Sequence, residues 1–184
     1  MMCLMSVDGA MLIVGTCMKV NQAAIDIIKH FESLHDGDLS VVGLQPKMCP
    51  AGIWTVGYGR ALRKRNGDFM RGPQDKALAY AMYPSITEQF AEEMLEEDLN
   101  SFSTEVHNLL KCQPTENQFG SMVSLAYNIG VHAFTKSSVL RYFNSNQIEK
   151  AAEAFSLWNK SSGKILKGLV LRRKAEQQLF LTQD

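Results

Sequence analysis

Several features that mark common protein classes are scarce in this sequence of 184 residues. The four cysteines are too few and too scattered for a disulfide framework, and no CxxC or HExxH spacing occurs. The four histidines are also far apart in the chain, so we expect no metal site. The 19 basic and 19 acidic residues leave a formal net charge of zero, and we therefore expect no nucleic-acid partner.

Long hydrophobic runs are missing as well. Residues 1–18 are largely apolar, but they include Asp8, lack a basic leading segment and contain no run long enough to span a membrane. We expect an extension without a fold of its own, and the alternative is a weak membrane-tethering segment. With 46% hydrophobic and 21% charged residues, the chain has an ordinary globular composition that supports one sizeable core.

The first predicted helix begins at Asn21, which is a good capping residue, and ends before Gly37. Its apolar residues recur every three or four positions, as in an amphipathic helix. Glu32 lies in the last turn, on the flank of the apolar stripe. Partial burial and the negative end of the helix dipole both favour a protonated carboxyl there, as a general acid requires. A surface glutamate that borders the core fits the same position.

A strand is predicted over residues 53–58, where alternation places Thr55 and Gly57 on one face. The pair Asn66-Gly67 then predicts a tight turn between two short extended runs. Gly57 and Gly59 do not form a nucleotide-binding loop, because position 62 is Leu where that motif needs glycine, and we expect no cofactor.

The second half of the chain is predicted to be helical. An apolar stripe runs from Phe90 to Leu109, and Thr115 with Gln118 forms a capping box for a helix that ends at Gly130. A further helix is predicted to begin with Asn146 as its cap and to run toward Trp158, and residues 163–181 are predicted to form the last one. The segment 160–174 contains six basic residues and no acid: Lys160, Lys164, Lys167, Arg172, Arg173 and Lys174. It predicts either contact with an anionic surface, such as an outer membrane, or a solvated helix face.

Four segments, in this order, resemble the phage-type lysozymes of glycoside hydrolase family 24: "IKHFESL", "CPAGIWTVGYG", "SLAYNIG" and "LKGLVLRR". The resemblance extends over nearly all of residues 19–181, and we assign residues 19–184 to the lysozyme domain. It implies an α+β, lysozyme-like fold in two lobes, with a substrate cleft between them. The first lobe, residues 19–83, would combine the N-terminal helix with a small antiparallel hairpin sheet and carry the catalytic residues. The second lobe, residues 84–184, would be mainly helical.

The catalytic pattern of that family falls on Glu32, Cys49 and Thr55 in this sequence. The resemblance implies that Glu32 is the general acid, and that Cys49 and Thr55 hold the attacking water. The loop before Cys49 is longer than in the family, so its Asp36 and Asp38 are rival candidates for a second catalytic carboxylate. An ionised thiol at position 49 could accept a proton, stabilise positive charge or attack carbon, and the sequence does not choose among these.

The resemblance further implies substrate contacts at four positions: Gly59, Tyr127, Asn128 and Ser137. Asn128 would fit equally well as part of a helix end. The family often has His at position 60, and the Arg60 found here is expected to form a supporting ion pair.

The implied function is that of a phage endolysin, a muramidase that cleaves bacterial peptidoglycan between N-acetylmuramic acid and N-acetylglucosamine. It would act as a monomer, be made in the host cytoplasm and reach the wall with a holin-type partner. One alternative is a lytic transglycosylase that uses Glu32 alone, and another is a non-catalytic wall- or membrane-disrupting protein. If the N-terminal segment enters a membrane, a disulfide between Cys49 and Cys3, Cys17 or Cys112 could hold the enzyme inactive.

Overall fold

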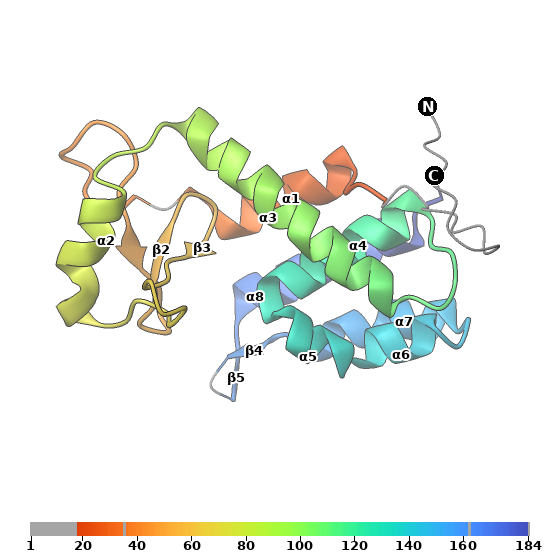
Figure 1. The fold of residues 1–184 in the computed structure, drawn as a ribbon. Coiled ribbons are helices and arrows are strands. Elements are labelled where there is room, and N and C mark those ends of the chain that lie inside the picture. Colours follow the sequence, from red (N-terminus) through yellow and green to blue (C-terminus); the bar gives the residue numbers. More distant parts are fainter. Residues whose placement is uncertain (1–17, 35, 162, 184) are drawn as a thin grey trace, which may run out of the picture.

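The computed structural model describes residues 18–34, 36–161 and 163–183 (Figure 1). The predictions for residues 1–17, namely the tethering segment and the pairing of Cys49 with Cys3 or Cys17, concern residues outside the described ranges. Small antiparallel sheets and many helices make up the molecule, as the α+β prediction requires. Figure 1 shows the larger sheet and α2 (Lys76–Met82) at one end, the later helices at the other, and α3 (Glu88–Leu109) running between them.

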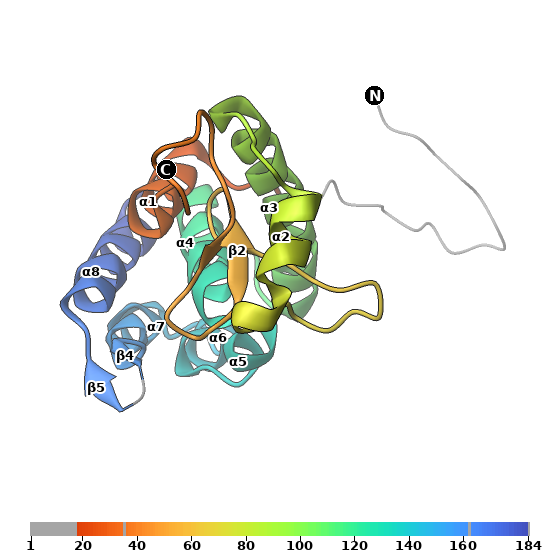
Figure 2. The ribbon, with the colours of Figure 1, turned by 90° about the vertical axis from the view of Figure 1, so that its left-hand side faces the viewer.

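The first helix, α1, spans Gln22–Glu32 and has the predicted cap. The Asn21 side chain accepts a hydrogen bond from the backbone N–H of Ala24 at 3.1 Å, which satisfies one of the donors that a helix start leaves unpaired. Ala24 and Ile28 are fully buried. The helix packs against α4 (Glu116–Ile129) and α8 (Lys167–Leu181), so it lies with the later helices of the chain (Figure 2).

The three-stranded sheet has the order β1 (Lys47–Met48), β2 (Trp54–Val56) and β3 (Arg60–Ala61), and all neighbours are antiparallel. The predicted strand is therefore shorter than expected. The predicted turn at Asn66-Gly67 is confirmed, because the Lys64 N–H donates to the Asp68 carbonyl at 2.7 Å and Gly67 has a φ of +89°.

The helical lobe is built around α4. Thr115 and Gln118 form the predicted capping box, and Gly130 ends the helix with a φ of +85°. Phe119, on α4, is fully buried, as are many of its apolar neighbours. By contrast, Phe90 at the start of α3 is 44% exposed, although the apolar pattern placed it on the inner face.

After α4 come the shorter helices α5 (Val131–Thr135), α6 (Ser138–Phe143) and α7 (Ile148–Ala154), and α8 follows later in the chain. Two 3-10 turns, η1 and η2, cover Pro73–Asp75 and Phe155–Leu157. The predicted cap of α7 is wrong: Asn146 adopts a φ of +56°, and Gln147 precedes the helix without a side-chain cap.

The prediction of one helix over residues 163–181 is also wrong at its start. A small hairpin of β4 (Lys160–Ser161) and β5 (Lys164–Ile165) comes first, because Gly163 reverses the chain with a φ of +79°. The extended Leu166 then leads into α8. Within the described ranges 18–34, 36–161 and 163–183, no helix is both long and apolar enough to cross a membrane.

Candidate active site

A cleft of about 630 Å³ lies between the sheet and α4, with α3 along one side. Its walls come from the end of α1, the turn after β1, β2, β3, α3 and α4. Six of the seven residues singled out in the sequence line it: Glu32, Cys49, Thr55, Gly59, Tyr127 and Asn128. The fold thus gathers chain segments almost a hundred positions apart around one space.

Glu32 is the last residue of α1, and its mostly buried side chain, 18% exposed, lines the cleft. Its Oε1 accepts a hydrogen bond from Arg172 Nη1 at 2.5 Å. Its Oε2 lies over Gly59, where a Cβ atom would come within 3.0 Å of that oxygen. Gly59 also has a φ of +87°, which side chains rarely adopt. Only glycine fits under this carboxyl without displacing it.

The first hairpin of the sheet brings Cys49 and Thr55 to the same face. Lys47 pairs with Thr55 in the antiparallel register, and the Cys49 N–H donates to the Ile53 carbonyl at 2.8 Å. Residues 47, 49, 53 and 55 therefore share one side of the hairpin. Cys49 is half-buried with a free thiol, and the buried Thr55 hydroxyl donates to the Lys47 carbonyl at 3.0 Å. Their predicted proximity follows from this register.

On the opposite wall, α4 supplies Tyr127 and Asn128. The Tyr127 hydroxyl donates to the Tyr58 carbonyl at 2.9 Å, which joins α4 to the sheet. Burial raises the pKa of Tyr127 above its usual range, so the phenol stays protonated and keeps this bond. Ser137 is placed differently: it is 2% exposed, and its hydroxyl caps α6 by accepting from the Leu140 N–H at 3.1 Å. Ser137 is therefore not among the residues that line the cleft.

Arg60 forms the expected ion pair. Its Nε donates to Asp98 Oδ2 at 2.9 Å, and its Nη2 bonds to the Met94 carbonyl and, at 3.1 Å, to the exposed Glu97. These contacts tie β3 to α3 at the rim of the cleft. Burial raises the pKa of the Asp98 carboxyl despite the opposing effect of Arg60.

The loop carboxylates Asp36 and Asp38 are not among the residues that line the cleft. Asp36 accepts a hydrogen bond from the Asp38 N–H at 3.1 Å. Asp38 accepts from the hydroxyl and the N–H of Ser40 at 2.5 and 3.0 Å, and these bonds lower the pKa of Asp38. Both carboxylates therefore act as turn residues within their own loop. Among the described residues, no group of three or more His, Cys, Asp or Glu could hold a metal ion.

The sequence did not indicate the contact of Arg172 with Glu32. The basic segment 160–174 predicts a charged surface, but Arg172 and Arg173 are 2% and 1% exposed, and neither is available to an anionic membrane. The four lysines of the segment are exposed: Lys160, Lys164, Lys167 and Lys174. The available signal was Glu176, which follows Arg172 by four positions and Arg173 by three, the spacing of side chains that meet on a helix.

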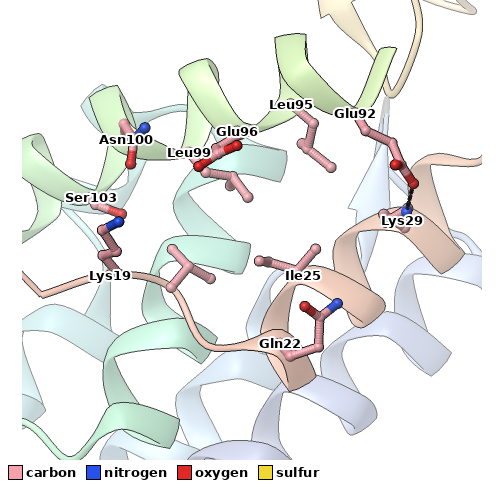
Figure 3. A pocket seen from close by; sticks show the side chains of 11 residues that line it. Lys19, Gln22, Ile25, Lys29, Glu92, Leu95, Glu96, Leu99, Asn100 and Ser103 are labelled. Atoms are coloured by element: carbon pink, nitrogen blue, oxygen red, sulfur yellow. Dashed lines mark hydrogen bonds and ion pairs between the residues drawn. The ribbon is translucent and has the colours of Figure 1, made fainter. Parts of the chain in front are cut away.

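A second cavity, of about 460 Å³, lies between α1 and α3 (Figure 3). Ile25 and Leu95 face one another across it, and Lys29 pairs with Glu92 at one end. This cavity contains none of the residues predicted for the site.

Comparison with known proteins gives the family. A sequence profile described as phage lysozyme matches residues 39–176, which is most of the chain. The chain belongs to the phage lysozyme family. The matched range includes Cys49, Thr55 and Arg172, and it begins after Glu32.

Two curated relatives of this chain are the endolysins of Bacillus phages B103 and PZA. They are 36% and 38% identical over 91% and 89% of the chain. The chain spans little more than half of their length, 56% and 55%. Among solved structures, the muramidase domain of SpmX from Asticaccaulis excentricus superposes with a TM-score of 0.69 at 32% identity, over 90% of this chain and 99% of that domain. These likenesses confirm the lysozyme-like α+β fold.

Proposed function

We propose that this chain is a phage endolysin that hydrolyses the β-1,4 bond between N-acetylmuramic acid and N-acetylglucosamine in bacterial peptidoglycan, and so lyses the host cell. The observation that carries the proposal is a single cleft lined by Glu32, Cys49 and Thr55. Membership of the phage lysozyme family supports it, as do the relatives named endolysin and the likeness to a muramidase domain.

In the proposed reaction, Glu32 donates its proton to the oxygen that leaves the anomeric carbon. Negative charge then develops on the carboxyl as positive charge develops on the sugar ring. Arg172 lies at 2.5 Å from Oε1 and is already oriented, so it stabilises that carboxylate without any reorganisation. The neighbouring Oε2, above Gly59, is the oxygen that would carry the proton toward the substrate.

The water would be held on the hairpin side of the cleft. Thr55 is fixed by its bond to the Lys47 carbonyl, and the half-buried Cys49 thiol lies on the same face. As the water oxygen bonds to the anomeric carbon, a Cys49 thiolate accepts the water proton, and the leaving oxygen takes the proton of Glu32. The step is then balanced with one general acid and one general base.

A lytic transglycosylase is the second candidate, and one observation favours it. The position of the second catalytic group carries a thiol, and the loop carboxylates Asp36 and Asp38 are outside the cleft. In that reaction the 6-hydroxyl of the muramic acid attacks in place of water, so Glu32 acts alone and the product is an anhydro sugar.

The proposed partners follow from this chemistry. Peptidoglycan is the substrate, and we propose that the chain acts on it as a monomer. An endolysin made in the cytoplasm needs a route across the membrane, and we assign that step to a holin-type partner.

The test is mass spectrometry of the fragments that wild type and Glu32→Gln release from purified peptidoglycan. The proposal expects hydrated reducing ends at muramic acid from wild type and none from the variant. Anhydro ends would establish the transglycosylase, and no soluble fragments from wild type would refute both activities.

Glu105→Gln is the matched control. Glu105 also lines the cleft, but it belongs to α3 and has no role in the proposed steps. We expect this variant to release the same fragments as wild type at a similar rate. Equal losses in Glu105→Gln and Glu32→Gln would mean that the cleft needs its overall negative charge and has no specific acid.

A further inference from the structure

A buried cluster of charged side chains lies behind Glu32, where α8 packs against α4 and α1. Glu176, in the middle of α8, is completely buried. Its Oε1 accepts hydrogen bonds from Ser124 Oγ at 2.7 Å, Arg172 Nε at 3.1 Å and Arg173 Nη2 at 2.9 Å. Its Oε2 forms an ion pair with Arg173 Nε at 2.8 Å. Glu176 is thus the hub that joins both arginines to α4.

The guanidinium of Arg172 has a different partner for each nitrogen. Nη1 donates to Glu32 at 2.5 Å, Nε donates to Glu176, and Nη2 donates to the Ser124 carbonyl at 3.4 Å. An arginine usually binds a carboxylate through two nitrogens at once. Here Nε and Nη2 are already occupied, so Arg172 meets Glu32 at a single oxygen.

The single contact matters for a general acid. A two-point arginine pair would engage both oxygens of Glu32 and strongly favour the ionised carboxylate. The contact at Oε1 alone leaves Oε2 for the proton that the reaction transfers. It also places the arginine where charge develops after the transfer.

The cluster is balanced in charge as well. Arg172 and Arg173 carry two positive charges, and Glu32 and Glu176 carry two negative charges when ionised. Burial lowers the pKa of Arg173 to about 10 even though Glu176 opposes that change, so the charges here interact in surroundings that screen them poorly. Without Glu176, two buried arginines would act on Glu32 alone.

We propose that Glu176 is a positioning residue for catalysis: it holds Arg172 in one-point contact with Glu32 and offsets the positive charge of the two arginines beside that carboxyl. This inference rests on the proposed role of Glu32 as general acid. Ser124 supports it by fixing Glu176 and the third nitrogen of Arg172 from α4.

Other titratable and charged groups lie near Glu32 and are left unchanged in these variants. Tyr127 faces it from α4, and the two interact electrostatically. Asp98 of α3 and Arg60 of β3 line the same cleft as a pair, and Cys49 lies on the hairpin wall. On α1 itself, Lys29 is bound to Glu92 of α3, and His30 precedes Glu32 by two positions.

The experiment follows kcat/KM against pH on soluble peptidoglycan fragments for wild type, Glu176→Gln, Arg173→Met and the double variant. A general acid works only when protonated, so its ionisation sets the alkaline limb of the profile. Glu176→Gln removes a negative charge and should move this limb to lower pH by about one unit, because a nearby charge changes an ionisation by that order. Arg173→Met should move it to higher pH, and the double variant should lie between them.

These variants separate positioning from folding. If the role of Glu176 is purely structural, Glu176→Gln should lower the melting temperature but leave the alkaline limb of kcat/KM at the same pH as in wild type. That result would overturn the proposal. If Glu176→Gln does not fold, the comparison uses Arg173→Met and the double variant. If the alkaline limb of kcat/KM lies at the same pH in these two variants, the positioning role of Glu176 is also overturned. Lys174→Gln, an exposed charge change on α8, is the control and should leave the limb in place.

A failure of the proposed function is distinguishable from a failure of this inference. Wild type that releases no fragments contradicts the muramidase proposal itself. Active wild type with an unmoved limb in Glu176→Gln contradicts only the positioning role.

Discussion

Arg172 and Glu32 are 140 residues apart in the sequence, and their side chains meet at 2.5 Å between Nη1 and Oε1. The contact joins the last helix of the chain to the end of the first. It places a permanent positive charge beside the carboxyl of the cleft, with only 3% of the Arg172 side chain exposed. A pair so shielded interacts more strongly than one at the surface. The predictions below concern the residues that shape the carboxyl's surroundings and the frame that holds them.

Gly59→Ala should lower kcat/KM by about 10- to 100-fold, because the new Cβ comes within 3.0 Å of Glu32 Oε2 and moves the carboxyl. Gly67→Ala is the control: its φ of +89° imposes similar backbone strain, but no atom lies within 4 Å of the added Cβ. Both variants should lose about 1–2 kcal/mol of unfolding free energy. Lysis assays should then show a loss of activity in Gly59→Ala only, and equal activities would contradict the close approach.

Cys49→Ala should lower kcat/KM by about 100-fold if the thiol accepts the water proton, since general base catalysis contributes on that order. Cys49→Asp should restore much of the activity because a carboxylate can take the same role. Cys112→Ala is the control, since Cys112 also has a free thiol but is not among the residues lining the cleft. A fully active Cys49→Ala would remove Cys49 from the mechanism and favour the transglycosylase.

Arg60→Met should destabilise the protein at pH 7 by about 1–3 kcal/mol, because it leaves the partly buried Asp98 carboxylate without its partner. Burial already raises the pKa of Asp98 in the folded state, and loss of Arg60 raises it further. The folded variant then binds a proton at Asp98 more tightly than the unfolded chain does. The loss of unfolding free energy caused by Arg60→Met is therefore complete above the folded-state pKa of Asp98. It disappears as the pH falls below the unfolded-state pKa of Asp98, which is about 4.

Urea unfolding of wild type and Arg60→Met at pH 7, 5 and 3 measures whether the loss of stability shrinks as the pH falls. Glu97→Gln removes the exposed partner of Arg60 and should lower the free energy of unfolding by no more than about 0.5 kcal/mol at any of these pH values. A loss in Arg60→Met that stays constant with pH would show that Asp98 is not its source.

Asp75→Asn should destabilise the protein at neutral pH but not in strong acid, because the Asp75 carboxylate has partners that favour its ionised form. Asp75 accepts from the Arg71 N–H at 2.7 Å and pairs with Lys64 at 2.9 Å, and these contacts lower its pKa. The unfolded state therefore binds the proton first, and the stability that Asp75 contributes is present above pH 4. It is lost as the pH falls through the lower folded pKa. Thermal melts of wild type and Asp75→Asn should differ at pH 6 and converge near pH 2.

Local signals in the sequence determined much of this protein. Asn21, the Thr115 and Gln118 capping box, and the Asn66-Gly67 turn satisfy backbone groups within a few residues, so each could be predicted from its neighbours alone. The same reasoning failed at Asn146, where the backbone takes a left-handed conformation and the helix starts without a side-chain cap. Cap chemistry is necessary for such a prediction but does not fix the backbone.

The tertiary structure alone decided which charges belong to the cleft. A helical pattern cannot distinguish a solvated arginine from a buried one, because that depends on what packs against the helix. Arg172 and Arg173 are buried only because Glu176 and Ser124 offer partners between α8 and α4. Likewise, Ser137 turned out to be a helix cap, and Gly59 proved to lie under the carboxyl of Glu32. The sequence by itself determined the long helices α1, α3 and α4, the Asn66-Gly67 turn and the candidate acid. Long-range packing decided how that acid is held, because the energy of a buried ion pair comes from residues far apart in the chain.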